Sequence, residues 1–295
     1  MRVETPRSVH GCYDVFTKCG TTYVLTPYDT PLAVDGAVEV VHPEHHHLRL
    51  YTVPGDSATV NGTYVKGREY HVSTCKLALT TMVRDSARFL PAWCRYHQSI
   101  GVDFFFIYDN NSSDDEFAAL VEAAAPFPGL IIRWNYPFVY GHCTQAGQQT
   151  HSICLSKHSV QRIGLFDIDE YLVVESGTLN ELITPPLVHV FWRWVGAGGV
   201  DSVDPRDYTK CARNREGQWY CKAICDPMRA LLGLIHNAHC PGIAPVKSES
   251  ASLYHFRGIT NNQGRECDMN NHGDCPYCQV ETTAVVQAWE RTPFE

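Results

Sequence analysis

The sequence has no surplus of positive charge, no internal repeat and no low-complexity tract. Its 24 lysines and arginines stand against 32 aspartates and glutamates, which gives a formal net charge of −8. Proteins bind nucleic acids largely by neutralising phosphates, so this balance argues against a nucleic-acid partner and leaves no basic helix for an anionic membrane. With 295 residues and 44% apolar content, the chain can bury a large core as one main domain with an appendage.

The most informative stretch spans residues 162–174 and reads RIGLFDIDEYLVV. Its apolar run lacks helical spacing, which indicates a buried strand. Carboxylates at the end of such a strand lie at the edge of an open α/β sheet where ligands bind. Asp167 and Asp169 are two positions apart, so on extended backbone they point the same way and offer the oxygen ligands that a hard divalent cation prefers. Such a cation can neutralise a diphosphate, which indicates chemistry on a nucleotide-activated substrate.

The motif alone has other interpretations. Acidic residues at a strand end can simply solvate a turn, and a DxD pair occurs by chance in many proteins. The run FDID is also similar to the nucleophile loop of haloacid-dehalogenase phosphatases. However, Tyr171 stands where that loop has Thr or Val, and the motif lies in the middle of the chain. The pattern upstream favours the nucleotide interpretation.

Strands and helices alternate upstream of the motif. Apolar runs predict strands, and helical spacing or capping signals predict helices, in the order 77–83, 87–100, 104–108, 116–125, 130–134 and 145–158. This alternation is typical of a parallel sheet with crossover helices. We therefore predict an α/β fold with a Rossmann-type, mostly parallel sheet and flanking helices.

Several blocks of the sequence resemble glycosyltransferase family 92 and its family 2-like relatives. The blocks are Tyr96-His97 before Gly101-Val102, YDNNSSD at 108–114, a Gln and a Cys within QAGQQTHSIC at 145–154, and DIDEY at 167–171. They occur in the order that is typical of the family, across residues 75–175. Weaker blocks follow, among them Lys222-Ala223-Ile224 and Leu253-Tyr254-His255-Phe256.

The resemblance implies a GT-A-like fold and a metal-dependent glycosyltransferase, either a hexosyl- or a pentosyltransferase. The enzyme would move a sugar from a nucleotide sugar, with UDP as the expected nucleotide, to a hydroxyl of a glycan or glycoconjugate, with inversion. The alternative is a catalytically inactive protein of the same fold that binds nucleotide sugars or carbohydrates.

The resemblance also implies a donor pocket at the ends of the first two strands. Asp85, where the family usually has Glu, and Asp109 would hydrogen-bond the base and ribose of the donor nucleotide. Asn110, Ser112 and Ser113 would shape this pocket.

The paired acids would hold Mn²⁺ or Mg²⁺ in a protein of this family. Asp169 is the expected direct ligand, and Asp167 is expected to contact ribose, metal-bound water or the metal itself. A histidine near the C-terminal end would complete the metal shell, with His255 as the first choice and His236 as the second. The cation would act as a Lewis acid on the leaving diphosphate.

An inverting mechanism needs a carboxylate within hydrogen-bond reach of the acceptor hydroxyl. Asp201 and Asp204, in the loop GGVDSVD, lie where an acceptor loop is expected, and Glu170 is the competing candidate. The sequence leaves these three alternatives open.

Residues 1–70 differ in pattern from the rest of the chain. Short β-like pieces at 22–25, 37–41 and 48–53 are separated by proline and glycine, with no crossover helix among them. We predict a small antiparallel β extension here, packed on a glycosyltransferase domain that spans 71–295. An independent binding module is the alternative, but so short a segment makes a thin core.

Thirteen cysteines are many for a cytosolic enzyme, and seven of them crowd the last third of the chain. This crowding predicts disulfides formed in an oxidising lumen. A zinc site is the alternative, with Cys275 and Cys278 joined by Cys267, Cys240 or His272.

Residues 1–30 contain no apolar run of ~20 residues, the length that spans a bilayer as a helix. We expect the secretory-pathway lumen if the chain is anchored or trimmed, and the cytoplasm otherwise. The sequence does not indicate an oligomeric state.

Overall fold

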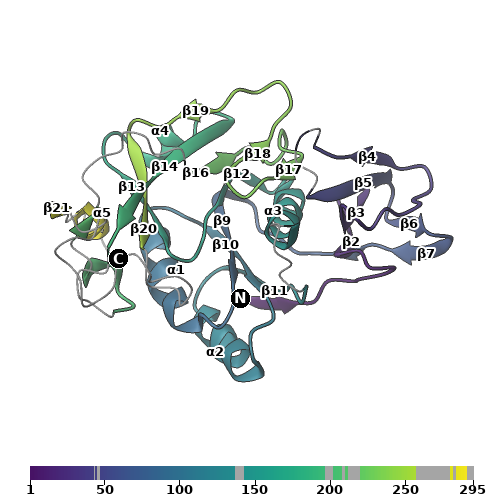
Figure 1. Ribbon diagram of the computed structural model, residues 1–295, viewed down its shortest axis with the longest axis horizontal. Helices are drawn as coiled ribbons and strands as arrows, with labels where there is room; N and C mark the ends of the chain where they lie inside the picture. Colours follow the sequence, from purple (N-terminus) through teal and green to yellow (C-terminus); the bar gives the residue numbers. More distant parts are fainter. Residues whose placement is uncertain are drawn as a thin grey trace.

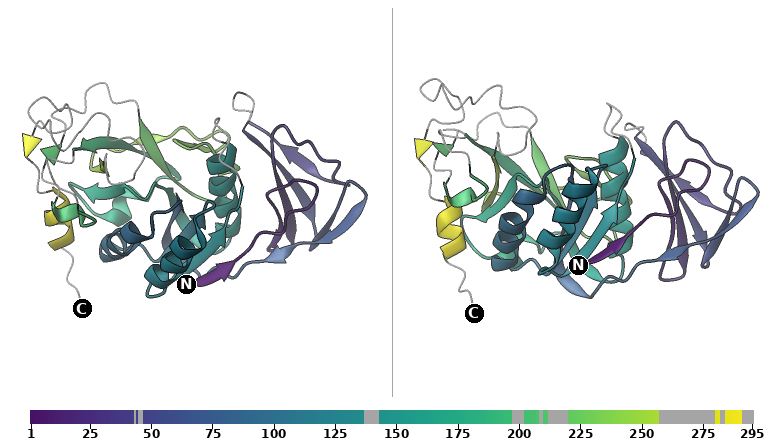
Figure 2. Two further views of the ribbon diagram at one scale, coloured as in Figure 1. Left: turned by 60° about the horizontal axis from the view of Figure 1, so that its bottom comes forward. Right: turned by 90° about the horizontal axis from the view of Figure 1, so that it is seen from below.

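The structure is a computed structural model that describes residues 1–42, 44, 47–136, 143–196, 202–207, 210–211, 220–256, 280–281 and 284–290. Within these ranges a 12-stranded sheet forms the centre of the molecule. A 5-stranded sheet built from N-terminal strands stands at one end (Figure 1, Figure 2).

Four parallel strands form the middle of the large sheet, in the order β11 (Gly129–Arg133), β10 (Phe104–Asp109), β9 (Cys75–Val83) and β12 (Val160–Leu165). Every residue of β10 is buried, as expected for a parallel strand with both faces covered. β10 and β11, which follow β9 in the chain, lie on one side of β9 in the sheet, and β12 lies on its other side. In α/β sheets, ligands bind at the carboxyl ends of the strands beside such a reversal.

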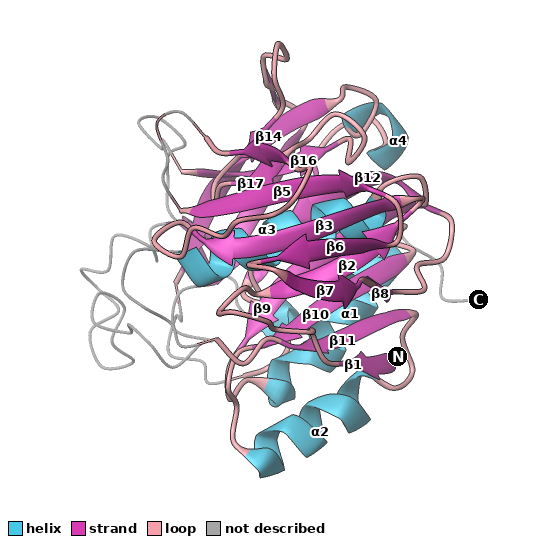
Figure 3. Ribbon diagram, turned by 90° about the vertical axis from the view of Figure 1, so that its right-hand side faces the viewer, coloured by secondary structure: helices cyan, strands magenta, loops and turns pink. Residues whose placement is uncertain are grey.

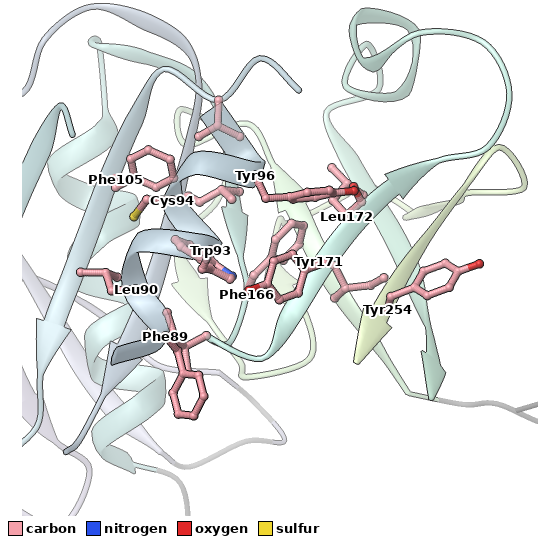
Figure 4. Packing of buried hydrophobic residues seen from close by; sticks show 14 of the residues in the cluster. Phe89, Leu90, Trp93, Cys94, Tyr96, Phe105, Phe166, Tyr171, Leu172 and Tyr254 are labelled. Atoms are coloured by element: carbon pink, nitrogen blue, oxygen red, sulfur yellow. The ribbon is translucent and has the colours of Figure 1, made fainter. Parts of the chain in front are cut away.

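Helices cover both faces of these strands. They are α1 (Leu90–Ser99) and α2 (Asp114–Ala124) on one face, and α3 (Cys143–Ser156) on the other. Phe105 of β10 points toward α1 (Figure 4), whereas its neighbour Phe106 joins the core beneath α3. This alternation follows from the two-residue period of a strand. The predicted α/β fold, with a Rossmann-type parallel sheet and flanking helices, is confirmed.

Strands from the second half of the chain extend the sheet beyond β12. β16 (Cys221–Cys225) pairs antiparallel with both β12 and β14 (Leu187–Val195). β20 (Ala251–Phe256) pairs antiparallel with β13 (Glu170–Val174) and parallel with β14. These pairings bring the C-terminal strands to the sheet edge where β12 ends.

The regular secondary structure described within residues 1–70 consists of strands. The 5-stranded sheet and a separate β6–β7 pair contain β2 (Asp14–Lys18), β3 (Thr21–Pro27), β4 (Val38–Val40), β5 (Leu48–Pro54), β6 (Ser57–Val60), β7 (Thr63–Lys66) and β8 (Arg68–Glu69). Figure 3 shows α3 behind β3 and β5, and α3 contacts both of these strands as well as β9 and β12. β1 (Arg2–Glu4) departs from this division, because it pairs with β11 in the large sheet.

The remaining elements are short. They are η1 (Ala87–Phe89), α4 (Leu179–Leu182), η2 (Pro205–Asp207), β15 (Lys210–Cys211), β17 (Leu232–Gly233), β18 (Ala238–His239), β19 (Val246–Lys247), β21 (Val280–Glu281) and α5 (Ala284–Glu290). None of the helices in the described ranges has the length and apolarity needed to cross a membrane.

A buried polar network joins the N-terminal sheet to the large one. Oδ2 of Asp14 accepts hydrogen bonds from the hydroxyl of Tyr70 (2.6 Å) and from Nε2 of His151 on α3 (3.0 Å). Nδ1 of His151 accepts from the hydroxyl of Tyr108 on β10 (2.8 Å). All four side chains are buried, so the N-terminal strands are hydrogen-bonded into the same interior as the parallel sheet.

The predicted disulfides are not found among the cysteines whose side chains the structure describes. Cys221, Cys225 and Cys240 of the last third are buried free thiols. Burial raises the pKa of Cys221 and of Cys240 to about 11, so both remain protonated at neutral pH. Cys267, His272, Cys275 and Cys278 lie outside the described residues, and the alternative zinc site falls there with them.

Candidate functional site

The DIDE motif forms the turn between β12 and β13. The side chain of Glu170 accepts a hydrogen bond from the backbone amide of Asp167 (2.8 Å), and the Glu170 amide donates to the Asp167 carbonyl (3.1 Å). Residues 168–169 are in a turn conformation. The expectation of extended backbone here is therefore wrong, and the two aspartates face different partners.

Helix α1 holds the start of β13 in place (Figure 4). The indole of Trp93 donates to the carbonyl of Glu170 (2.9 Å), and the hydroxyl of Tyr96 donates to the carbonyl of Leu172 (2.8 Å). Nε2 of His97 accepts from the Leu172 amide (3.3 Å). Burial lowers the pKa of His97 to about 3, so this imidazole is neutral in the folded protein. The start of β13 is thus hydrogen-bonded to side chains of α1.

Asp167 is held by two side chains from distant parts of the chain. Its Oδ1 accepts from Nε2 of Gln145 on α3 (2.8 Å), and its Oδ2 accepts from Nζ of Lys222 on β16 (2.7 Å). Lys222 is fully buried, and its Nζ also lies 3.8 Å from Oε1 of Glu170. Burial lowers the pKa of Lys222, but the charges of Asp167 and Glu170 outweigh this effect and raise the pKa above its ordinary value. Lys222 is therefore a permanent cation inside the acidic turn.

Asp169 meets His255 on the other side of the turn. Oδ2 of Asp169 lies 3.3 Å from Nε2 of His255, and the backbone amide of Phe256 donates to the Asp169 carbonyl (2.9 Å). The antiparallel register of β13 and β20, which sets Glu170 opposite His255, fixes this approach. Sequence analysis placed both residues at a metal site, and the structure brings these two together.

Aromatic rings enclose the imidazole of His255. Trp194 stacks on it with 4.7 Å between ring centroids, and Trp192 meets it edge-on at 4.5 Å. His236 packs on the same Trp192 ring at 5.2 Å, and its Nδ1 lies 3.2 Å from the carbonyl of Cys221. Of the two candidate histidines, His255 contacts the DIDE turn through Asp169.

The tips of β9 and β10 interlock beside each other. The amide of Asp85 donates to Oγ of Ser112 (2.9 Å), and the amide of Ser113 donates to Oδ1 of Asp85 (3.0 Å). The amide of Ser112 donates to Oδ1 of Asp109 (3.3 Å). Because β9 is also the parallel neighbour of β12, the three strand tips meet at one sheet edge.

These predicted donor-pocket residues differ in how accessible they are. The side chain of Asp85 is 49% exposed, whereas Asp109 is fully buried beside Arg133, with 3.7 Å between Oδ2 and Nε. Asn110 is buried and donates to the carbonyls of Trp134 and Tyr136. Asp85 can therefore meet a ligand directly, while Asp109 and Asn110 support the surrounding backbone.

The three candidate bases differ in their surroundings. Asp201 lies outside the described residues. Asp204 is bound by Arg206, with 2.9 Å between Oδ1 and Nε. Burial raises the pKa of Asp204, but the hydrogen bonds and charge of Arg206 outweigh it, so the pKa lies below its ordinary value. Burial raises the pKa of Glu170 well above its ordinary value against the opposing charge of Lys222.

A divalent cation would find only part of a ligand shell here. Among the described residues, no three His, Cys, Asp or Glu side chains lie close enough to hold a metal ion together. The Asp169–His255 pair nevertheless fits two positions of such a shell, because neighbouring ligand atoms on one cation of Mg²⁺ size lie about 3 Å apart. The oxygens of Asp167 are engaged by Gln145 and Lys222. A bound diphosphate and water would have to supply the remaining ligands.

Sequence reasoning gave no role to Lys222 or Gln145. A signal for Lys222 exists, since it is the only charged residue of the otherwise apolar strand CKAIC. An unpaired charge is costly in such a strand, so a buried acidic partner was to be expected. The partner itself could not be read from the sequence.

The strand tips, their polar side chains and the DIDE turn all lie in one continuous segment of known type. Residues 77–186 match Glycosyltransferase family 92. This family 92 region contains Asp85, Asp109, Asp167 and Asp169, whereas Lys222 and His255 lie beyond it. The resemblance that the sequence blocks indicate is confirmed for this region.

Three plant proteins are similar to the family 92 region. A "Glycosyltransferase family 92 protein" of Ricinus communis is 32% identical over 102 residues, which cover 35% of this chain and 18% of the relative. Proteins with the same description from Oryza sativa and Arabidopsis thaliana are 34% and 33% identical over 96 residues, or 32% of this chain and 16% of each relative. The chain thus spans less than a fifth of the length of the curated relatives it matches.

Two solved structures are distantly similar to this chain. An inositol-1-phosphate CTP transferase from T. maritima has a TM-score of 0.30 at 9% identity, covering 53% of this chain and 73% of that chain. HddC from Yersinia pseudotuberculosis has a TM-score of 0.32 at 10% identity, covering 62% of this chain and 90% of that chain.

Proposed function

We propose that this protein is a glycosyltransferase that moves a sugar from a UDP-sugar to a hydroxyl of a glycan or glycoconjugate, with inversion. The observation that supports this proposal best is the convergence of three strand tips. Asp85 after β9, Ser112 and Ser113 after β10, and the DIDE turn after β12 share one edge of a parallel sheet. Such an edge is where nucleotides bind in α/β folds.

The donor nucleotide would lie across the β9 and β10 tips. Asp85 is the exposed acid there and would accept hydrogen bonds from the ribose or base. The buried side chains of Asp109 and Asn110 hold the backbone around the β10 tip through hydrogen bonds. Asp169 and His255 would hold Mn²⁺ or Mg²⁺, which when bound supplies Lewis-acid assistance to the leaving diphosphate. Asp167, held by Gln145 and Lys222, would contact ribose or metal-bound water from a fixed position.

The acceptor would be activated by a carboxylate. The base takes the proton of the acceptor hydroxyl as its oxygen bonds to the anomeric carbon, and the bond from that carbon to the nucleoside diphosphate breaks. Glu170 is closed off by Lys222 and by the amide of Asp167. This leaves Asp201 and Asp204 as the bases that we propose, with the Arg206 ion pair opening if Asp204 acts.

Released nucleotide tests this proposal. The protein is incubated with hexose- and pentose-containing nucleotide sugars and Mn²⁺, with and without glycan acceptors. We expect nucleotide release from at least one UDP-sugar, and its loss in Asp169→Ala while the circular dichroism spectrum is unchanged. Asp56→Ala is the matched control, because Asp56 is 62% exposed and lies in the N-terminal region.

A wild-type protein that binds UDP but releases nucleotide from no donor would contradict the proposal. It would support the alternative function, a nucleotide-sugar-binding protein without catalysis. Normal turnover by Asp169→Ala would exclude the proposed metal site.

A further inference from the structure

One buried lysine lies beside the acids of the proposed cation site. Lys222 is fully buried on β16, and its Nζ lies 2.7 Å from Oδ2 of Asp167 and 3.8 Å from Oε1 of Glu170. Nζ also lies 5.8 Å from the ring centroid of Trp192, whose other contacts include His255. A lysine is almost never fully buried unless it is paired with an acid, so the burial of Lys222 indicates that its charge acts on the acids beside it.

Strand pairing places Lys222 beside the DIDE turn. β16 runs antiparallel to β12, with Gly164 opposite Ile224, so the N-terminal end of β16 lies beside the C-terminal end of β12. On its other edge β16 pairs with β14, which sets Lys222 opposite Val190. The position is therefore fixed by two strand neighbours and not by a loop.

The two aspartates of the turn carry more negative charge than Lys222 offsets. Asp167, Asp169 and Glu170 lie within four residues, and Lys222 is the only cation among the described residues with a recorded ion pair to Asp167 or Glu170. Oδ2 of Asp167 is bound to Lys222 and Oδ1 is bound to Gln145, so both oxygens of this carboxylate already have partners. Asp169 is left as the acid that faces His255.

We propose that Lys222 is a positioning residue that holds Asp167 away from the cation, so that Asp169 and His255 alone offer protein ligands to it. The inference deepens the proposed function and rests on it. Without Lys222, Asp167 can turn toward the cation, and the site loses a positive charge. Both changes strengthen cation binding, but Asp167 is lost from its place beside the donor.

The test measures Mn²⁺ binding apart from turnover. Free Mn²⁺ is followed by electron paramagnetic resonance during titration of the wild type, Lys222→Met, Lys222→Arg and Lys66→Met. We expect Lys222→Met to bind Mn²⁺ about three- to tenfold more tightly, because a nearby positive charge has been removed. Lys222→Arg keeps the charge and should bind Mn²⁺ like the wild type. Lys66 is 66% exposed, so Lys66→Met is the control for loss of a surface lysine.

Turnover should move in the opposite direction. We expect kcat for nucleotide release to fall at least about tenfold in Lys222→Met, while the Mn²⁺ concentration for half-maximal rate also falls. A merely structural defect would lower activity without tightening cation binding. The double variant Lys222→Met/Asp167→Asn removes both charges of the ion pair, so it leaves no unpaired buried charge that could unfold the protein. We expect it to bind Mn²⁺ like the wild type and to keep the low kcat of Lys222→Met.

The outcomes separate this inference from the proposed function. Unchanged or weaker Mn²⁺ binding in folded Lys222→Met would overturn the role of Lys222, as would a wild type that binds no Mn²⁺. Tighter Mn²⁺ binding in Lys222→Met would uphold the role of Lys222 even if no donor is turned over, and would then count against glycosyl transfer alone.

Discussion

The carboxylate of Asp169 and the imidazole of His255 face each other across two antiparallel strands, with 3.3 Å between Oδ2 and Nε2. The residues are 86 positions apart in the chain. One offers an oxygen and the other a nitrogen, the two atom types that bind first-row divalent cations. This pair is the part of the proposed metal site that the described structure assembles.

Replacing His255 should weaken metal binding. For His255→Ala we expect the Mn²⁺ concentration that supports half-maximal nucleotide release to rise by at least about tenfold, because one protein ligand is lost. His236→Ala is the matched control, since His236 contacts Trp192 and the Cys221 carbonyl. The reverse order of effects would make His236 the ligand.

Nucleotide and cation should stabilise the protein together. A ligand that binds only the folded state stabilises it by about 2.7 kcal/mol when present at 100 times its dissociation constant. We therefore expect UDP with Mn²⁺ to raise the thermal midpoint, and EDTA to abolish the increase. In Asp169→Ala, the part of the increase in thermal midpoint that depends on Mn²⁺ should disappear, as measured by differential scanning fluorimetry. An increase with UDP and EDTA equal to that with UDP and Mn²⁺ would contradict a metal-bridged diphosphate.

Acid should destabilise the fold through His97. Burial lowers its pKa to about 3 from an ordinary value of 6.5, so the unfolded chain binds a proton that the folded chain does not. The stabilisation is complete above about pH 6.5 and is lost as pH falls toward about 3, by roughly 1.4 kcal/mol per pH unit. From pH 7 to pH 5, His97 should thus contribute a loss of about 2 kcal/mol in the free energy of unfolding.

Asn at position 97 provides the control for this pH effect. Its side-chain amide can donate to the Trp93 carbonyl, as Nδ1 of His97 does, but it cannot titrate. Urea denaturation at pH 7 and pH 5 should show that the free energy of unfolding of His97→Asn falls less than that of the wild type, by about 2 kcal/mol. An identical slope in the two proteins would place the acid sensitivity elsewhere.

Removing Asp14 should destabilise the whole protein and not only its N-terminal strands. Asp14→Ala leaves His151 and Tyr70 without their shared acceptor in the interior, and each buried polar group left without a partner costs roughly 1–3 kcal/mol. We expect one cooperative thermal transition at a lower temperature. Asp56→Ala should change the free energy of unfolding by less than about 0.5 kcal/mol. A separate early transition in Asp14→Ala would instead indicate an independent N-terminal module.

The parallel part of the fold could be predicted because its signals are local. The apolar runs of β9, β10 and β11 stand out from amphipathic helices, since a buried parallel strand needs apolar residues on both faces. The polar ends of these strands follow directly in the sequence, so Asp85, Asp109 and the DIDE motif could be placed at one edge in advance.

The turn conformation of the DIDE motif was missed for a physical reason. Two aspartates separated by one residue are compatible with extended backbone and with a turn, and Glu170 decides between them by accepting the amide hydrogen of Asp167. The cysteine count was also misleading. Cys221, Cys225 and Cys240 serve as small buried side chains, a use of cysteine that composition does not distinguish from disulfides.

The sequence by itself determined the parallel sheet, its flanking helices and the acids at its edge, because periodicity and strand ends are properties of neighbouring residues. Only the tertiary structure decided which distant side chains meet those acids. Lys222 reaches Asp167 because β16 pairs with β12, and His255 reaches Asp169 because β20 pairs with β13. Strand register across dozens of residues depends on packing of the whole core, and a shift by one residue would turn both side chains away.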